Sequence, residues 1–145
     1  MKLNLRPVEK KDYEKILEWR NDPDVRINSL TQHVISIDEH IEYWTEFLKN
    51  ITNFAFIVVH GHEDIGVLKL KNVNKITYEI DIFLSKGSRN KGLGPQILKL
   101  AKEIAAQKNI KRLIAKIKYD NEASKKAFER GGFSPKLIYY EAEVK

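Results

Sequence analysis

The spacing of apolar residues in the first third of the chain predicts one strand and two helices. Residues 2–6 (KLNLR) alternate between polar and apolar side chains, as a half-buried strand does. Asp12 can cap a first helix, which residues 21–23 (NDP) should end. Ser36 stands three residues before a glutamate, which is the spacing of a capping box, so we expect a second helix over about residues 38–49.

The middle of the chain predicts a meander of three strands. Residues 54–60 (FAFIVVH) form a nearly continuous apolar run, which is typical of a strand covered on both faces. After a turn, residues 65–73 return as the hairpin partner. Residues 76–84 alternate strictly and give the third strand.

Strands and helices alternate in the last part of the chain. A basic, glycine-containing loop over residues 85–92 leads into a long helix over residues 93–108, whose apolar positions have the spacing of a buried face. Residues 112–117 predict a strand, and residues 121–130 predict a helix that a Gly-Gly pair closes. Residues 133–143 supply the last strand or two.

These elements predict an α/β (α+β) fold with one central sheet. The 145 residues fit a single domain, since domains commonly run about 100–200 residues. We expect residues 1–145 to form that domain around a mixed, mostly antiparallel sheet of six to seven strands, with helices on both faces.

Composition narrows the class of protein. A hydrophobic fraction of 42% and a charged fraction of 32% are ordinary for a soluble globular protein. No apolar run approaches the ~20 residues needed to cross a bilayer, and the start lacks a signal-peptide core, so we expect a cytoplasmic protein with no membrane partner. The absence of cysteine excludes disulfides, zinc–thiolate sites and a cysteine nucleophile.

The charge balance limits the choice of partners. A net charge of +6 favours anionic partners, such as nucleic acid, anionic lipid or a phosphorylated small molecule, although lysines that simply solubilise the surface explain it equally well. No block of basic residues with interleaved aromatics marks a nucleic-acid groove, so we expect no nucleic-acid partner. His40 stands without cysteines or clustered acids, so we expect no metal.

The loop before the helix at residues 93–108 has the features of a phosphate site. A glycine-rich turn that enters a helix leaves several backbone N–H groups without intrahelical partners, at the positive end of the helix dipole. Gly92 and Gly94 remove Cβ atoms that would hold a phosphate away, while Arg89 and Lys91 add positive charge. Tight packing at the helix start explains the two glycines about as well. The spacing does not match a P-loop or a dinucleotide-binding fingerprint.

Three motifs in this half of the chain resemble a known family. The sequence R-x-x-G-x-G at residues 89–94 resembles the acetyl-CoA-binding motif of the GCN5-related N-acetyltransferase (GNAT) superfamily. N-x-x-S at residues 121–124 and Gly-Phe at residues 132–133 resemble its next landmarks, in the same order and at the same separation. The N-terminal half, including W-R-N at residues 19–21, resembles acetyltransferases of ribosomal-protein N-termini and, more closely, of nucleotide-linked amino sugars such as those leading to pseudaminic acid.

The resemblance implies a binding site for acetyl-CoA as cosubstrate. Backbone groups of residues 89–94 would bind the pyrophosphate, and the main chain of residues 81–85 would pair with the pantetheine. Asn121 would bond the coenzyme near its pantetheine, and Lys125 or Lys126 would approach the ribose phosphate, although a solvated helix face explains both lysines as well. The implied coenzyme-binding residues are Phe83, Leu84, Ser85, Arg89, Asn90, Lys91, Gly92, Leu93, Gly94, Asn121, Ser124 and Lys125.

Two carboxylates stand on one face of the strand at residues 76–84. Burying unpaired charges is costly, so either Glu79 and Asp81 face an open cleft or their charges have a role in the function of the protein. Amine acetylation needs an unprotonated nitrogen, so Glu79 is the candidate base and Asp81 a weaker one. The alternative is that Glu79 only pairs with a nearby arginine such as Arg20 or Arg26.

The family often has a tyrosine that protonates the leaving thiolate, in the helix after the asparagine. That position is Phe128 in this chain, which puts a tyrosine acid in doubt. Tyr139, Tyr140 or water could substitute, or the thiolate leaves without an acid.

In the family, the first two helices cover the acceptor groove. The implied acceptor-binding residues are Trp19, Arg20, Asn21, Arg26 and Tyr43. Guanidinium groups match phosphate geometry, and aromatic rings can stack on a sugar or base. The alternatives are that Trp19 belongs to the core and that the arginines pair with nearby acids.

Three functions follow as hypotheses. The first is direct transfer of the acetyl group of acetyl-CoA to the primary amine of a nucleotide-linked amino sugar, by a monomer or homodimer. The second is acetylation of an N-terminal peptide or ribosomal protein, which would call for a groove with acidic residues. The third is a non-catalytic acyl-CoA-binding module, which a buried Glu79 salt bridge without an open cleft would support.

Overall fold

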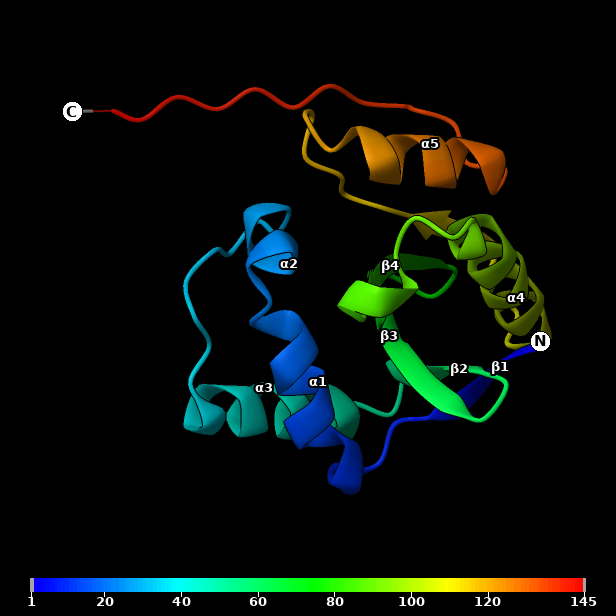
Figure 1. The fold of residues 1–145 in the computed structure, drawn as a ribbon. Helices are drawn as coiled ribbons and strands as arrows, with labels where there is room; N and C mark the ends of the chain where they lie inside the picture. The colour runs from blue at the N-terminus through cyan, green and yellow to red at the C-terminus, as the bar shows by residue number, and fades with distance from the viewer. Residues whose placement is uncertain (1, 145) are drawn as a thin grey trace.

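Five strands form one sheet in the order β1-β2-β3-β4-β5 (Figure 1). The structure is a computed structural model, and it describes residues 2–144. The strands are β1 (Leu3–Pro7), β2 (Phe54–His60), β3 (Glu63–Asn72), β4 (Thr77–Leu84) and β5 (Arg112–Ile114). The helices are α1 (Tyr13–Arg20), α2 (Pro23–Ile27), α3 (Ile37–Lys49), α4 (Leu93–Gln107) and α5 (Glu122–Arg130), with 3₁₀ turns η1 (Lys10–Asp12) and η2 (Lys86–Ser88). Neighbouring strands from β1 to β4 are antiparallel, whereas β5 runs parallel to β4.

Two apolar clusters fix helices to opposite faces of the sheet. On one face, α4 packs through Ile97, Leu98 and Ala101. On the other, α1 and α3 pack through residues that include Ile16 and Trp44. The mixed, mostly antiparallel sheet with helices on both faces is therefore confirmed.

The expected number of strands was wrong, because residues 133–144 form none of the strands that the structure describes. A strand needs a hydrogen-bonding partner. This segment instead runs as an extended trace from α5 past α2, with Leu137, Ile138 and Tyr140 exposed (Figure 1). The fifth strand is also shorter than the expected residues 112–117.

The helix starts differ in detail from those expected. Ser36 caps α3, since its Oγ accepts the Glu39 amide at 3.1 Å, but the Glu39 carboxylate reaches His33 (2.9 Å) instead of closing a capping box. The expected break after α1 is present, and Asp22 caps α2 there by accepting the Asp24 amide at 2.9 Å. Asp12 precedes α1 but makes no side-chain cap, because its carboxylate has other partners.

Those contacts join β1, the 3₁₀ turn η1 that precedes α1, and β3. The Arg6 guanidinium donates to both oxygens of Asp12 (2.8 and 2.9 Å) and to Asp64 (2.9 Å). The Asp12 carboxylate also accepts the Glu9 amide at 2.8 Å. Burial raises the pKa of Asp12, but the Arg6 and Glu9 hydrogen bonds outweigh it, so that the pKa is lowered below its ordinary 3.8. The ionised carboxylate is thus the form that stabilises this corner.

Replacing Asp12 with alanine should lower the free energy of unfolding by about 2–3 kcal/mol. This loss is smaller than the ~3–5 kcal/mol that breaking a fully buried ion pair costs. The reason is that Arg6 is partly exposed and still pairs with Asp64 in the variant. Asp12→Asn, which keeps the shape and an acceptor for Glu9, should recover part of the loss. Urea unfolding at pH 7 measures both.

The pH dependence separates charge from packing. A lowered folded pKa means that the unfolded state binds more protons, so the stabilisation is present above pH 3.8 and is lost as the pH falls through the folded value. The stability gap between the native protein and Asp12→Asn should therefore close in acid. A gap that persists at pH 2 would contradict this assignment.

Candidate active site

A cleft opens where β4 and β5 part. Their pairing runs from Thr77↔Arg112 to Glu79↔Ile114, whereas β4 continues to Leu84. Between the diverging chains lies a cleft of about 1100 Å³. Its walls are the end of β4, the segment after β5, the loop before α4, the first turns of α5, and residues from α1, α2 and α3.

Most of the expected coenzyme residues meet in this cleft. The residues of that set that line it are Phe83, Leu84, Arg89, Asn90, Gly92, Leu93, Gly94, Asn121 and Ser124. Within the described part of the chain, Ser85, Lys91 and Lys125 do not line it. Ser85 donates to the Ser88 hydroxyl (2.9 Å) and Lys125 pairs with Glu122 (3.2 Å), whereas Lys126 does face the cleft.

The loop before α4 owes its shape to two left-handed residues. Asn90 has φ of 60° and Gly92 has φ of 71°, and Gly92 stands at the N-cap of α4 without a side-chain hydrogen bond. A Cβ on Gly92 would meet nothing within 4 Å, so the main chain there is open to a ligand. A Cβ on Gly94 would lie 3.1 Å from the Ala127 Cβ. Gly94 therefore serves the packing of α4 on α5, the alternative explanation for that glycine.

Arg89 uses its side chain to hold the loop. Its Nε and Nη2 donate to the Leu84 carbonyl at 3.0 and 2.9 Å. Its Nη1 lies 3.4 Å from Asp22 and 3.5 Å from Asp24, at the start of α2. The positive charge of Arg89, which was expected to face a phosphate, is thus paired with two carboxylates. The groups of this loop that stay open to a ligand are those of its backbone.

Asn121 and Ser124 form a helix cap at the other wall. The Asn121 Oδ1 accepts the Ser124 amide at 3.2 Å, and its Nδ2 donates to the Ser124 hydroxyl at 3.0 Å. The motif spacing is therefore that of an N-cap of α5, with both side chains facing the cleft.

The two candidate carboxylates line the cleft on the face of the sheet that carries α1 and α3. The Glu79 side chain is 26% exposed and pairs with Lys116 at 3.5 Å, so its partner is neither Arg20 nor Arg26. The Asp81 side chain is 59% exposed and pairs with Lys69 at 3.5 Å. Both acids thus face an open cleft, the first of the two explanations considered for them.

Lys69 is a cleft residue that the sequence interpretation missed. Its side chain is 16% exposed, and its Nζ donates to the Tyr43 hydroxyl at 2.7 Å and lies 4.7 Å from that ring's centre. The antiparallel register puts Lys69 opposite Asp81, so pairing the two alternating segments in register would have found it. His40 also lines the cleft, and burial lowers its pKa, which keeps the ring neutral near pH 7.

The expected acceptor residues divide into two groups. Arg20 and Tyr43 line the cleft, whereas the Trp19 side chain lies in the core at 8% exposed. Arg20 donates to the Thr31 carbonyl at 2.7 Å, while its buried Nη1 has no hydrogen-bond partner. Burial lowers the pKa of Arg20.

Asn21 and Arg26 hold the loop that follows α2. The Asn21 amide group donates to the Ile35 carbonyl at 2.9 Å and accepts its N–H at 2.8 Å. Arg26 donates to the Asn21 carbonyl at 3.1 Å. In the described structure neither side chain is among the cleft-lining residues.

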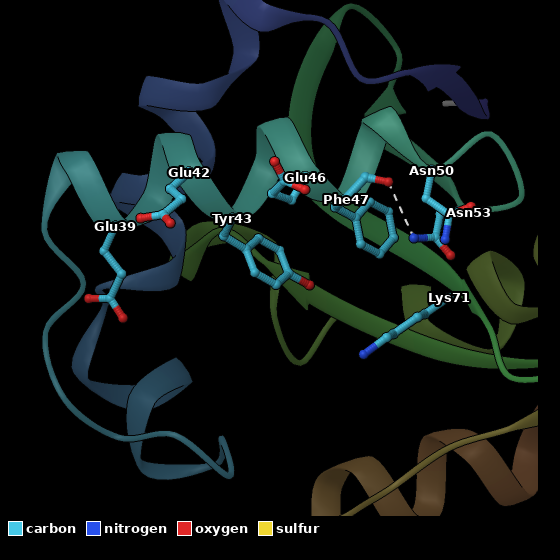
Figure 2. A pocket seen from close by; sticks show the side chains of 8 residues that line it. All are labelled: Glu39, Glu42, Tyr43, Glu46, Phe47, Asn50, Asn53 and Lys71. Carbon is cyan, nitrogen blue, oxygen red and sulfur yellow. Dashed lines mark hydrogen bonds between the residues drawn. The ribbon is translucent and has the colours of Figure 1, made fainter.

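A second hollow of about 440 Å³ runs along α3 beside the cleft (Figure 2). It is lined by Glu39, Glu42, Tyr43, Glu46, Phe47, Asn50, Asn53 and Lys71. The rings of Tyr43 and Phe47 stack with centres 5.9 Å apart. We call this second hollow the α3 groove. Glu39 and Tyr43 line both the α3 groove and the cleft, so the groove continues the cleft.

No tyrosine takes the expected acid position, where Phe128 packs edge-on against Phe133 at 5.0 Å. Tyr139 and Tyr140 are exposed in the segment after α5. Among residues 2–144, no three His, Asp or Glu side chains gather closely enough to hold a metal ion. Nor does any helix in that range have the length and apolar character to span a membrane.

The sequence of the chain matches a family model, the acetyltransferase (GNAT) domain, over residues 2–134. The chain belongs to this family. It is an acetyl-CoA-dependent N-acetyltransferase. The resemblance of the three motifs to that family is thereby confirmed, while the amino-sugar subgroup remains a prediction. Comparison with the sequences of curated proteins gives no match.

Solved structures share the fold of this acetyltransferase at low sequence identity. A domain from Methanocaldococcus jannaschii is 20% identical with a TM-score of 0.84, covering 97% of this chain and 93% of its own. Spermidine N-acetyltransferase from Vibrio cholerae is 19% identical with a TM-score of 0.85, covering 93% and 82%. An N-acetyltransferase from Staphylococcus aureus is 26% identical with a TM-score of 0.76, covering 92% and 84%.

Gly92→Leu should abolish acetyl-CoA binding, because the new side chain would occupy the open space above the α4 start. Its left-handed φ adds a strain of about 1–2 kcal/mol, which the fold should survive. Gly87→Leu is the matched control, since a Cβ there also meets nothing within 4 Å and Gly87 lies outside the cleft lining of residues 2–144. Calorimetric titration measures affinity and thermal unfolding checks the fold. Native affinity in Gly92→Leu would remove the loop from the coenzyme site.

Proposed function

We propose that the enzyme acetylates a primary amine by direct attack on acetyl-CoA, with Glu79 as the base. The observation that carries this proposal is the Glu79 carboxylate, which faces the cleft at the residue where β4 and β5 part. Residues 89–94 would bind the coenzyme pyrophosphate with backbone N–H groups. The β4 main chain from Asp81 would pair with the pantetheine, which brings the thioester close to Glu79.

The chemistry then removes two protons from the acceptor nitrogen, one before the attack and one after it. Glu79 takes a proton from the acceptor ammonium, directly or through water, so that nitrogen has a lone pair. The nitrogen attacks the thioester carbonyl carbon and the C–N bond forms. The nitrogen then loses its second proton to water, and the C–S bond breaks to leave the neutral amide. Coenzyme A leaves as the thiolate, which suits a cleft in which Phe128 offers no proton. An open cleft beside Glu79 gives no support to a purely non-catalytic module.

The acceptor that the geometry favours is a cationic amine, such as a polyamine or an N-terminal peptide. The α3 groove presents three carboxylates, of Glu39, Glu42 and Glu46, against the single ammonium of Lys71 (Figure 2). An acidic groove was the requirement set for a peptide acceptor. The fold also accommodates such amines, since the Vibrio cholerae spermidine N-acetyltransferase structure is a complex with CoA and spermine.

A nucleotide-linked amino sugar is the second candidate acceptor. The resemblance of the N-terminal half favours it, and so does the unpartnered Nη1 of Arg20 in the cleft wall. The bonds of Arg20 and Arg26 to loop carbonyls weigh against a diphosphate clamp, because a phosphate would compete with them.

Glu79→Gln should lower kcat by ~10²–10⁴-fold while acetyl-CoA affinity stays nearly native. Lys116→Met is the control, since it removes the ion-pair partner but leaves the carboxylate. If Glu79 were only structural, both variants would act alike through stability. Steady-state rates of thiol release from pH 6 to 9 decide the point. A fall in kcat of less than about threefold would reject Glu79 as the base.

Acceptor choice can be tested with spermidine, a UDP-amino sugar and an N-terminal peptide. For a cationic acceptor, Glu42→Gln/Glu46→Gln should raise its KM about three- to tenfold, because exposed charges are worth up to about 1 kcal/mol each. The KM of acetyl-CoA should not change. Glu63→Gln, at the start of β3 and outside the described lining of both hollows, is the control for the loss of a surface carboxylate.

For a sugar nucleotide, Arg20→Ala should raise KM about ten- to a hundredfold instead, since Arg20 lines the cleft and Arg26 does not. Native acceptor kinetics in the α3 double variant, together with a large effect of Arg20→Ala, would replace the cationic acceptor by the nucleotide sugar.

A further inference from the structure

One wall of the cleft is fastened by polar contacts. This wall is the α2 segment, residues 22–35, from which Asp24, Val25, Asn28, Ser29, Leu30, Thr31 and Ile35 line the cleft. None of the residues of α2 is buried, and Ile27, Leu30 and Val34 are exposed apolar side chains. Hydrophobic burial therefore contributes little to holding α2, and a wall held this way can open at low cost.

Internal hydrogen bonds keep the α2 segment together as a unit. The Ser29 hydroxyl donates to the Val25 carbonyl at 2.6 Å, and the Asn28 side chain donates to the Asp24 carbonyl at 3.1 Å. The Asp22 carboxylate caps α2. Movement at one end of α2 is thus transmitted to the loop behind it.

Arg89 ties this unit to the coenzyme loop. Its guanidinium holds the Leu84 carbonyl, where β4 ends, and its Nη1 reaches Asp22 and Asp24 across 67 and 65 residues of sequence. The pKa of Asp22 is lowered first by the Asp24 amide and further by Arg89. At the far end of α2, Lys118 donates to the Ile27 carbonyl at 2.9 Å from the segment after β5.

We propose that Arg89 is a positioning residue that couples coenzyme binding to closure of the α2 segment over the acceptor side of the cleft. The proposal rests on the proposed function, since it takes residues 89–94 as the coenzyme loop. A ligand on the loop main chain restricts the Arg89 backbone. The guanidinium then loses less freedom when it pairs with Asp22 and Asp24, so the coenzyme favours the closed wall. By linkage, the closed wall favours the coenzyme to the same extent.

Hydrogen exchange with coenzyme A as the probe tests the coupling without an acceptor. In the native protein, coenzyme A should protect the amides of residues 89–94 and also those of residues 22–35. The Asp22→Asn/Asp24→Asn variant should keep the first protection and lose the second. Asparagine is as good an N-cap as aspartate, so α2 keeps its start. Coenzyme A affinity in this variant should fall by no more than about fivefold, the lower end of typical couplings.

Controls keep the coupling distinct from a simple loss of structure. Lys118→Met removes the hydrogen bond at the far end of α2 and leaves Arg89 in place. It should raise exchange in residues 22–35 without coenzyme, yet retain the added protection when coenzyme A binds. Arg89→Lys keeps a charge but cannot bond Leu84 and both acids at once, so it should lose the added protection of residues 22–35 as the double variant does. It should also weaken the protection of residues 89–94, because the Leu84 bonds hold that loop. Thermal unfolding confirms that each variant is folded.

Each other outcome overturns a defined part of the proposal. Protection of residues 89–94 with no change in residues 22–35 of the native protein would exclude the coupling and leave the coenzyme site intact. Equal protection of residues 22–35 in the native protein and the double variant would exclude Arg89 as its carrier. Absence of protection at residues 89–94 would overturn the coenzyme site, and with it the proposed function.

Discussion

The candidate active site depends on the point at which the parallel pairing of β4 and β5 ends. β5 stays with β4 up to the pair Glu79↔Ile114 and then leaves it, while β3 supports β4 along its whole length from the other side. A sheet normally satisfies main-chain groups by pairing, and a strand that loses one neighbour becomes a template for an extended ligand. The same divergence exposes Glu79 and Asp81, which a closed sheet covered by helices would have buried at high cost.

The coenzyme motif divides its work between main chain and side chains. The groups that we propose bind the anion are the backbone N–H groups around Gly92, where two left-handed residues turn the chain into α4. Gly94 allows α5 to pack close to α4, and Arg89 holds the loop to the end of β4. Charged or small residues in a motif can therefore be required for architecture as much as for contact with the ligand.

The groove along α3 shows that the net charge of the chain is a poor guide to the local electrostatic field. The chain carries +6, yet Arg26 bonds a main-chain carbonyl and Arg20 does so with one of its nitrogens. What remains along α3 is a groove with three glutamates beside two stacked rings. Helix spacing places Glu39, Glu42 and Glu46 on one face, and only the position of α3 beside the cleft makes that face relevant to an acceptor.

Local rules determined most of the elements, because hydrophobic period, caps and glycine turns act over a few residues. Apolar spacing predicted α3, α4 and the β2–β4 meander, and the loop motif predicted a coenzyme site at residues 89–94. Long-range partners decided the rest. The Asp12 carboxylate pairs with Arg6 and does not cap α1. The Arg89 guanidinium lies against Asp22 and Asp24. Residues 133–144 have no partner strand in the described structure despite their β-prone side chains. Each of these outcomes depends on which groups lie opposite one another in space. The alternation of polar and apolar residues along the chain does not determine those long-range neighbours.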